Sequence, residues 1–191
     1  MISHSFSGTV YAADYTRYNE DLHEEQSPVR GVYFSGSEPP LIPSFVLENR
    51  HGHPFEAVSF EENSTLLRRP DGTLLPQCEG MFYAYREESP AWVLFLELKY
   101  CESKAVYGNT LSAMAQLEET CKYVMEEKCL LDNEKYKRYF VVSTPNVDPL
   151  DPFDANYFNQ DDMLTYKEKC KAIVFFSNRV CVHTPVHLKL K

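Results

Sequence analysis

The alternation of hydrophobic and polar positions along the chain predicts several short strands around one long helix. After Gly108, apolar residues recur at helical spacing, which predicts a helix over residues 109–128. Runs of β-branched and aromatic residues bounded by turn residues predict strands on either side of this helix. The expected strands cover residues 44–49, 55–61, 77–85, 91–100, 138–144, 171–178 and 180–190. This order of elements indicates an α+β or mixed α/β fold.

The 191 residues are expected to form a single domain. Residues 1–44 are rich in Tyr, Ser, Pro and acidic residues and predict an irregular N-terminal segment, with a short helix around residues 17–26. A core over residues 44–143 follows, and then an acidic loop over residues 144–168. Residues 169–191 are expected to supply the terminal strands.

The strands expected at residues 77–85 and 91–100 are separated by the polar residues REESP and predict an antiparallel hairpin. A turn centred on these polar residues places Glu79 opposite Glu97. Opposed β-carbons lie roughly 5 Å apart, and like charges at that distance are destabilising. Lys99 shares a face with Glu97, because side chains two residues apart in a strand point the same way. The hairpin therefore predicts two carboxylates and an ammonium group at one end of a buried strand.

Two carboxylates beside a lysine suit a divalent cation. Mg²⁺ binds through one or two carboxylates together with waters and phosphate oxygens, and Mn²⁺ takes similar oxygen ligands. A metal held by Glu79 and Glu97 would polarise a phosphodiester and lower the pKa of a bound water, with Lys99 orienting that water. The alternative is a solvated strand end at which Glu97 and Lys99 form an ordinary ion pair worth about 0 to 1 kcal/mol.

The formal net charge of −9 weighs against nucleic acid as a partner. Nucleic-acid binders usually gain affinity from a basic surface that displaces counterions, so a phosphate-handling role here needs a metal ion or a local basic patch. Lys135, Lys137 and Arg138 alternate with aromatic residues, as in surfaces that bind single strands, but the same pattern is typical of a strand entrance. A protein partner that contacts an acidic face is the alternative.

No apolar run approaches the roughly 18 residues that a membrane span needs, and the first residues lack the features of a secretory signal. We therefore expect a cytoplasmic protein without membrane contact. Six cysteines without a CxxC pair predict reduced thiols, and a cysteine nucleophile at Cys101 or Cys181 is an alternative that no motif marks. Asp148, Asp151 and Asp154 recur at every third residue, which does not match a calcium loop of the EF-hand type.

The stretch QCEGMFYAYREESPAWVLFLELKY, followed by a helix that contains AQLEET, resembles the PD-(D/E)xK, restriction-endonuclease-like superfamily. The resemblance covers about residues 44–143 and implies a mixed central β-sheet flanked by helices and a magnesium-dependent nuclease. It implies that Glu79 is the first acid of the site and that Glu97 and Lys99 form the acid-x-lysine motif. Gln116 would be the helix residue of the site, and the carbonyl of Leu98 would be an additional metal ligand.

The chain departs from the pattern of this superfamily at two places. Cys78 and Glu79 stand where the superfamily has a proline-aspartate pair; glutamate also binds magnesium, but its longer side chain shifts the metal. For the acid that many members carry on a first helix, Glu48 is the candidate, with Glu24 and Glu25 as weaker ones. Two hypotheses result: a Mg²⁺-dependent nuclease, and a catalytically inactive module of the same fold that binds a protein partner.

Overall fold

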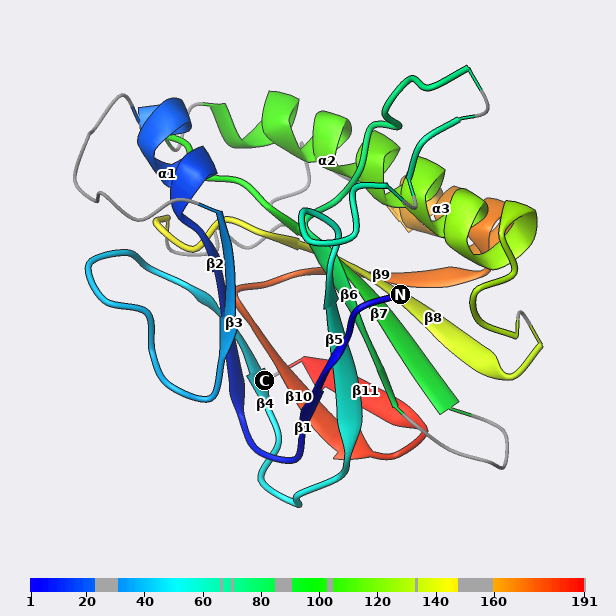
Figure 1. The fold of residues 1–191 in the computed structure, drawn as a ribbon, viewed down its shortest axis with the longest axis horizontal. Coiled ribbons are helices and arrows are strands. Elements are labelled where there is room, and N and C mark those ends of the chain that lie inside the picture. The colour runs from blue at the N-terminus through cyan, green and yellow to red at the C-terminus, as the bar shows by residue number, and fades with distance from the viewer. Residues whose placement is uncertain are drawn as a thin grey trace.

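The computed structural model describes most of the chain. The described residues are 1–22, 31–65, 67–69, 71–84, 91–102, 105–132, 134–147 and 160–190. They form two β-sheets and three α-helices (Figure 1). The fold is therefore mixed α/β, as the order of elements predicts.

Sheet A has six strands and carries the predicted hairpin. Its order is β1 (His4–Phe6), β5 (Phe55–Ser59), β6 (Gly80–Ala84), β7 (Ala91–Leu98), β8 (Tyr136–Ser143) and β9 (Ala172–Phe176). The first four strands pair antiparallel, whereas β7, β8 and β9 are parallel. Parallel neighbours need a crossover connection, and helices α2 (Val106–Lys122) and α3 (Gln160–Cys170) lie in the two crossovers.

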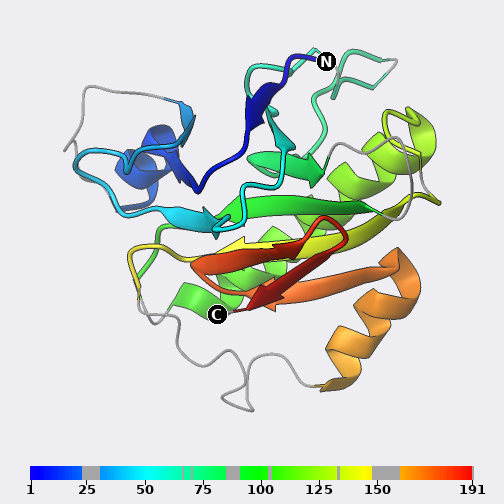
Figure 2. The ribbon, with the colours of Figure 1, turned by 90° about the horizontal axis from the view of Figure 1, so that it is seen from below.

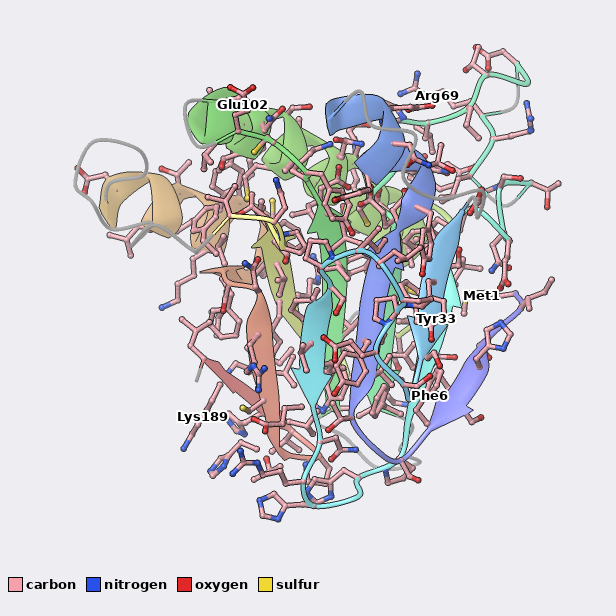
Figure 3. All side chains as sticks on the ribbon, turned by 90° about the vertical axis from the view of Figure 1, so that its left-hand side faces the viewer. Met1, Phe6, Tyr33, Arg69, Glu102 and Lys189 are labelled. Atoms are coloured by element: carbon pink, nitrogen blue, oxygen red, sulfur yellow. The ribbon has the colours of Figure 1, made fainter. Side chains whose placement is uncertain are left out.

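Sheet B has five strands and packs against one face of sheet A. Its order is β11 (His187–Leu190), β10 (Arg179–Thr184), β4 (Phe45–Glu48), β2 (Val10–Asp14) and β3 (Val32–Ser35). In Figure 3, strands of sheet B run in front of β7 and β8, with α1 (Tyr15–Leu22) above them. Alternate apolar residues of both sheets form the core between them, among them Ala12, Leu47 and Leu94.

The helices cover the other face of sheet A, so the molecule has three layers. Val93 and Phe95 of β7 pack in a second core with Met114 and Leu117 of α2. A π-helical turn, η2 (Tyr123–Glu127), continues α2, and α3 lies beside β9 (Figure 2). Because β7 is covered on both faces, all eight of its residues are buried.

Three features differ from the sequence-based expectation. Helices do not flank sheet A on both faces; in the described part of the chain sheet B takes one side, because strands of the terminal segments supply a second apolar surface. Residues 1–44, expected to be irregular apart from a short helix around residues 17–26, contain the strands β1, β2 and β3, while α1 confirms part of that helix. The expected acidic loop over residues 144–168 contains most of α3, while Asp148, Asp151 and Asp154 lie outside the described residues.

None of the helices in the described ranges is long and apolar enough to span a membrane.

Candidate functional site

The pairing of β6 with β7 brings Glu79 and Glu97 together. Gly80 pairs with Leu96 and Tyr83 with Val93, and extending this register by one residue places Glu79 opposite Glu97. The predicted register is therefore confirmed. Both side chains are removed from water: Glu79 is 7% exposed and Glu97 is fully buried.

Glu97 and Lys99 point toward the helical layer. Val93 and Phe95, at the same parity of β7, belong to the core that contains α2, and side chains two residues apart share a face. The Lys99 ammonium nitrogen lies 2.5 Å from Oε1 of Glu97. The Lys99 side chain is only 9% exposed, so this ion pair is buried and is not the solvated pair of the alternative interpretation.

Helix α2 holds both halves of the site. The Lys99 ammonium donates a hydrogen bond of 2.8 Å to Oε1 of Gln116, and the Gln116 amide donates one of 2.9 Å to the carbonyl of Gln77. One turn farther along α2, the hydroxyl oxygen of Thr120 accepts a 3.0 Å hydrogen bond from the backbone N–H of Cys78. The segment that carries Glu79 is therefore fixed to the same helix that contacts Lys99.

The two carboxyl groups are electrostatically unfavourable where they lie. Burial raises the pKa of Glu79 well above its usual range, and the nearby charge of Glu97 raises it further. Burial also raises the pKa of Glu97, while a hydrogen bond with Glu79 and the charge of Lys99 partly offset the effect. The backbone N–H of Leu98 donates a 2.9 Å hydrogen bond to Oε2 of Glu79. The pair consequently retains a proton more strongly than either carboxyl group would in water.

The residues present fit a hard divalent cation. Both oxygens of Glu97 are fully buried, and the described groups at this carboxyl are the Lys99 ammonium and the carboxyl of Glu79, which shares a hydrogen bond with it. Buried carboxylate oxygens are normally satisfied by donors or metal ions. Two carboxylates are enough protein ligands for Mg²⁺, although within the described ranges no group of three His, Cys, Asp or Glu residues is arranged to hold a metal.

An acidic cavity of about 290 Å³ opens beside Glu79. It lies between α1, the start of β3 and the segment before β6, at the end of the molecule that carries α1 (Figure 1). Asp14, Glu20 and Glu61 line it together with Glu79, and Arg17 is the single cation in its described lining. This excess of negative charge favours a cation inside the cavity.

Asp14 is the most perturbed of the additional acids. Burial raises its pKa to about 6, and the charges of Glu79 and Glu61 contribute to the rise. The carboxylate also accepts a 2.9 Å hydrogen bond from the backbone N–H of Arg17, which caps the first turn of α1. Sequence reasoning missed this residue. The available signal was an aspartate directly after the apolar strand VYAA and directly before a helix.

Several predicted residues do not contribute side chains to this site. Glu48 was proposed as the acid of a first helix, and this is wrong: it ends strand β4 of sheet B and forms an ion pair of 2.7 Å with Arg50. The residue of a first helix that does line the cavity is Glu20 of α1. Glu24 and Glu25 lie outside the described residues.

The basic residues around the start of β8 lie away from the site. Parallel pairing of Ala91 with Tyr136 and of Leu98 with Ser143 places the start of β8 beside the start of β7, about 20 Å along the strand from Leu98. Lys135 pairs with Asp132, and Lys137 lies over the ring of Tyr139. Arg138 is buried and donates to the carbonyl of Cys170. These three cations therefore do not supply a basic patch next to the carboxylates.

Comparisons of the chain with protein-family models, with curated proteins and with solved structures find no match. The functional assignment therefore depends on the chemistry of the site itself.

Proposed function

We propose that the protein is a Mg²⁺-dependent phosphodiesterase that cleaves nucleic acid, with Glu79, Glu97, Lys99 and Gln116 as its site. The observation that carries the proposal is the contact of one buried lysine with both partners: its ammonium group lies 2.5 Å from Glu97 and 2.8 Å from Gln116. A purely structural ion pair between Glu97 and Lys99 does not require Glu79 opposite Glu97. Two opposed carboxylates cost stability. Such unfavourable arrangements of ionisable groups are concentrated at functional sites.

The order of elements supports the resemblance to the restriction-endonuclease-like superfamily. Three features follow one another in the order that the resemblance implies. They are an acid before β6, an acid-x-lysine at the end of β7 and a glutamine on the following helix α2. The parallel strand β8 after α2 brings the chain back beside β7. We therefore interpret sheet A with α2 as the nuclease-like core and sheet B as an addition to it.

Each residue has a distinct task in this proposal. Glu79 and Glu97 would hold Mg²⁺, with the carbonyl of Leu98 as an additional ligand. A bound Mg²⁺ would polarise the phosphodiester and lower the pKa of a coordinated water. Lys99 neutralises charge that develops on the phosphate oxygens and orients the attacking water. Gln116 holds the ammonium group of Lys99 in place through its own hydrogen bond to Gln77.

The acidic cavity favours a second candidate function as well. Four carboxylates around one arginine, in a chain of net charge −9, also suit a basic segment of a protein partner. In that case the fold would serve as a binding module without catalysis. The two candidates differ in whether Glu97 is needed for binding a divalent cation.

Titration of Mg²⁺ and Mn²⁺ by calorimetry tests the proposal. We expect wild type to bind either ion and the isosteric variant Glu97→Gln to lose binding, with parallel loss of cleavage of DNA or RNA oligonucleotides. Glu168→Gln is the matched control, because Glu168 is an exposed glutamate of α3 in the other helix crossover. Equal ion binding by wild type and Glu97→Gln would overturn the metal site and favour the binding module.

A further inference from the structure

A second cavity, of about 230 Å³, lies next to the acidic one. Its lining is dominated by three half-buried aromatic rings, with polar groups at one side. The lining residues are His4, Phe6, Val32, Tyr33, Phe34, Ser59 and Glu62. Tyr33 and Phe6 lie on the side of the molecule that carries β1 and β3 (Figure 3).

The two cavities share a wall. Val32 lines both, and its backbone N–H donates a 2.7 Å hydrogen bond to Glu61 of the acidic cavity. Glu61 lines the first cavity and the next residue, Glu62, lines the second. The two cavities are therefore neighbours.

Phe34 lies beside the segment that carries Glu79, on the face of sheet A that sheet B covers. Its ring packs so closely on Gly80 that a Cβ at this glycine would lie 2.6 Å from the ring. Gly80 follows Glu79 in the chain and is the first residue of β6, paired with Leu96. The absence of a side chain at Gly80 thus allows an aromatic ring to lie beside the segment that positions the first acid.

The polar groups of the second cavity can form hydrogen bonds with the edge of a planar ring. Oε2 of Glu62 lies 3.0 Å from Nε2 of His4, and no hydrogen bond to Oε1 is formed by the residues that the structure describes, so Oε1 can accept from a ligand. Both side chains are about half exposed, at 49% and 52%. A carboxylate accepts hydrogen bonds from the exocyclic amino groups of bases, as in its pairing with cytosine N4.

We propose that the aromatic cavity binds the base of the nucleotide whose phosphate lies at the Glu79 and Glu97 site. This inference rests on the proposed function and defines its substrate class as single-stranded nucleic acid or an unpaired strand end. A base in a duplex is stacked and paired on both sides, so it cannot enter a cavity lined by rings without leaving the helix. Glu62 favours bases that carry an exocyclic amino group over thymine and uracil.

Binding of small ligands tests the cavity without requiring catalysis. The probes are deoxyadenosine, deoxyadenosine 5′-monophosphate and deoxyribose 5-phosphate, titrated by calorimetry with Mg²⁺ present. We expect the nucleotide to bind wild type at least about tenfold more tightly than the sugar phosphate, because stacking of one base on aromatic side chains contributes about 1–3 kcal/mol. Phe34→Leu should lose most of this difference, whereas Phe175→Leu, which changes a half-buried ring of β9, should keep it.

A second variant keeps the test valid if Phe34→Leu does not fold. Glu62→Leu changes a half-exposed side chain and removes the acceptor, and we expect it to remove the preference for deoxyadenosine and deoxycytidine over thymidine. Equal binding of nucleotide and sugar phosphate by wild type that still binds Mg²⁺ would overturn the base site and leave the proposed function standing. Binding of deoxyadenosine by a wild-type protein that binds no Mg²⁺ would support the cavity and overturn the nuclease.

Discussion

Lys99 and Gln116 are joined by a hydrogen bond of 2.8 Å between Nζ and Oε1, which links the end of β7 to the middle of α2. Gln116 in turn donates to the carbonyl of Gln77, two residues before Glu79. This one amide therefore orients the lysine and restrains the segment of the first acid.

Replacing Gln116 by methionine should impair catalysis without abolishing metal binding. The variant preserves the volume of the side chain but removes the acceptor for Lys99, and displacement of a catalytic group by about 1 Å costs on the order of 100-fold in rate. We expect kcat to fall by about 10- to 100-fold while Mg²⁺ affinity measured by calorimetry stays near that of wild type. Ser112→Ala, at an exposed position of α2, is the control. An unchanged kcat would show that Gln116 does not position Lys99.

Glu79→Gln should stabilise the fold while removing metal binding. The amide removes the repulsion between opposed carboxylates and still offers an oxygen to the N–H of Leu98, which now donates to Glu79 at 2.9 Å. We expect the free energy of unfolding at pH 8, measured with urea, to rise by about 1 kcal/mol.

The stability difference between wild type and Glu79→Gln should depend on pH in a direction that can be checked. The folded protein raises the pKa of Glu79, so wild type loses stability as pH rises above the ordinary range of a glutamate, and the variant does not lose this contribution. The difference between the two proteins should therefore shrink toward pH 4. A variant that is less stable than wild type at pH 8 would contradict a strained carboxylate pair.

Asp14→Asn should flatten the dependence of stability on pH. Folding raises the pKa of Asp14 from 3.8 to about 6, so the folded state holds this proton more tightly and wild type loses stability as pH rises through that interval. At 1.36 kcal/mol per pH unit this amounts to about 3 kcal/mol. Asparagine keeps the cap on the N–H of Arg17. Urea unfolding of both proteins from pH 4 to pH 7.5 measures the difference, and parallel curves would contradict the burial of Asp14.

Thr120→Val should destabilise the fold and loosen the site. Thr120 is fully buried, and its hydroxyl oxygen accepts from the N–H of Cys78 while its hydroxyl donates to the carbonyl of Gln116. Valine has nearly the same shape but leaves the N–H of Cys78 without its acceptor, at a cost of about 1–3 kcal/mol.

Thr165→Val provides a matched control for this experiment. Thr165 makes the same kind of hydrogen bond to the carbonyl four residues earlier, but on an exposed face of α3. We expect a change in the free energy of unfolding below about 0.5 kcal/mol for this variant. Equal losses in the two variants would mean that the contact between Thr120 and Cys78 contributes nothing.

The hairpin could be predicted from sequence because both of its determinants are local. The polar turn between two apolar runs sets the register, and alternation of side chains then places Glu97 and Lys99 on one face. The helix was also predictable, although α2 starts at Val106 and continues as η2, and Leu111 of its apolar stripe is 46% exposed. The later members of the stripe, Met114, Leu117, Cys121 and Val124, are buried.

The acidic cavity could not be predicted because its walls come from distant parts of the chain. Asp14 and Glu61 are 47 positions apart and meet only because sheet B packs on sheet A beside β5. Glu48 follows the apolar run FVL, whereas Glu20 follows the polar stretch TRYN, and the pairing of β4 with β10 and β2 places Glu48 on another surface. Partition of the strands between two sheets is a long-range property that periodicity does not encode.

Strand β7 has a consequence for the internal motions of the molecule. Its backbone is paired on both sides and all eight of its residues are buried, so its amide protons should exchange with solvent only in openings that approach global unfolding. Glu97 belongs to this strand and Lys99 follows it, and the N–H of Lys99 is still paired with Ser143 at 2.9 Å. The wall formed by α1 has no such double pairing. Hydrogen exchange should therefore be slowest at the amide of Glu97 and faster in α1. Local opening of α1 can then admit a ligand to the cavity while the distance between Glu97 and Lys99 stays fixed.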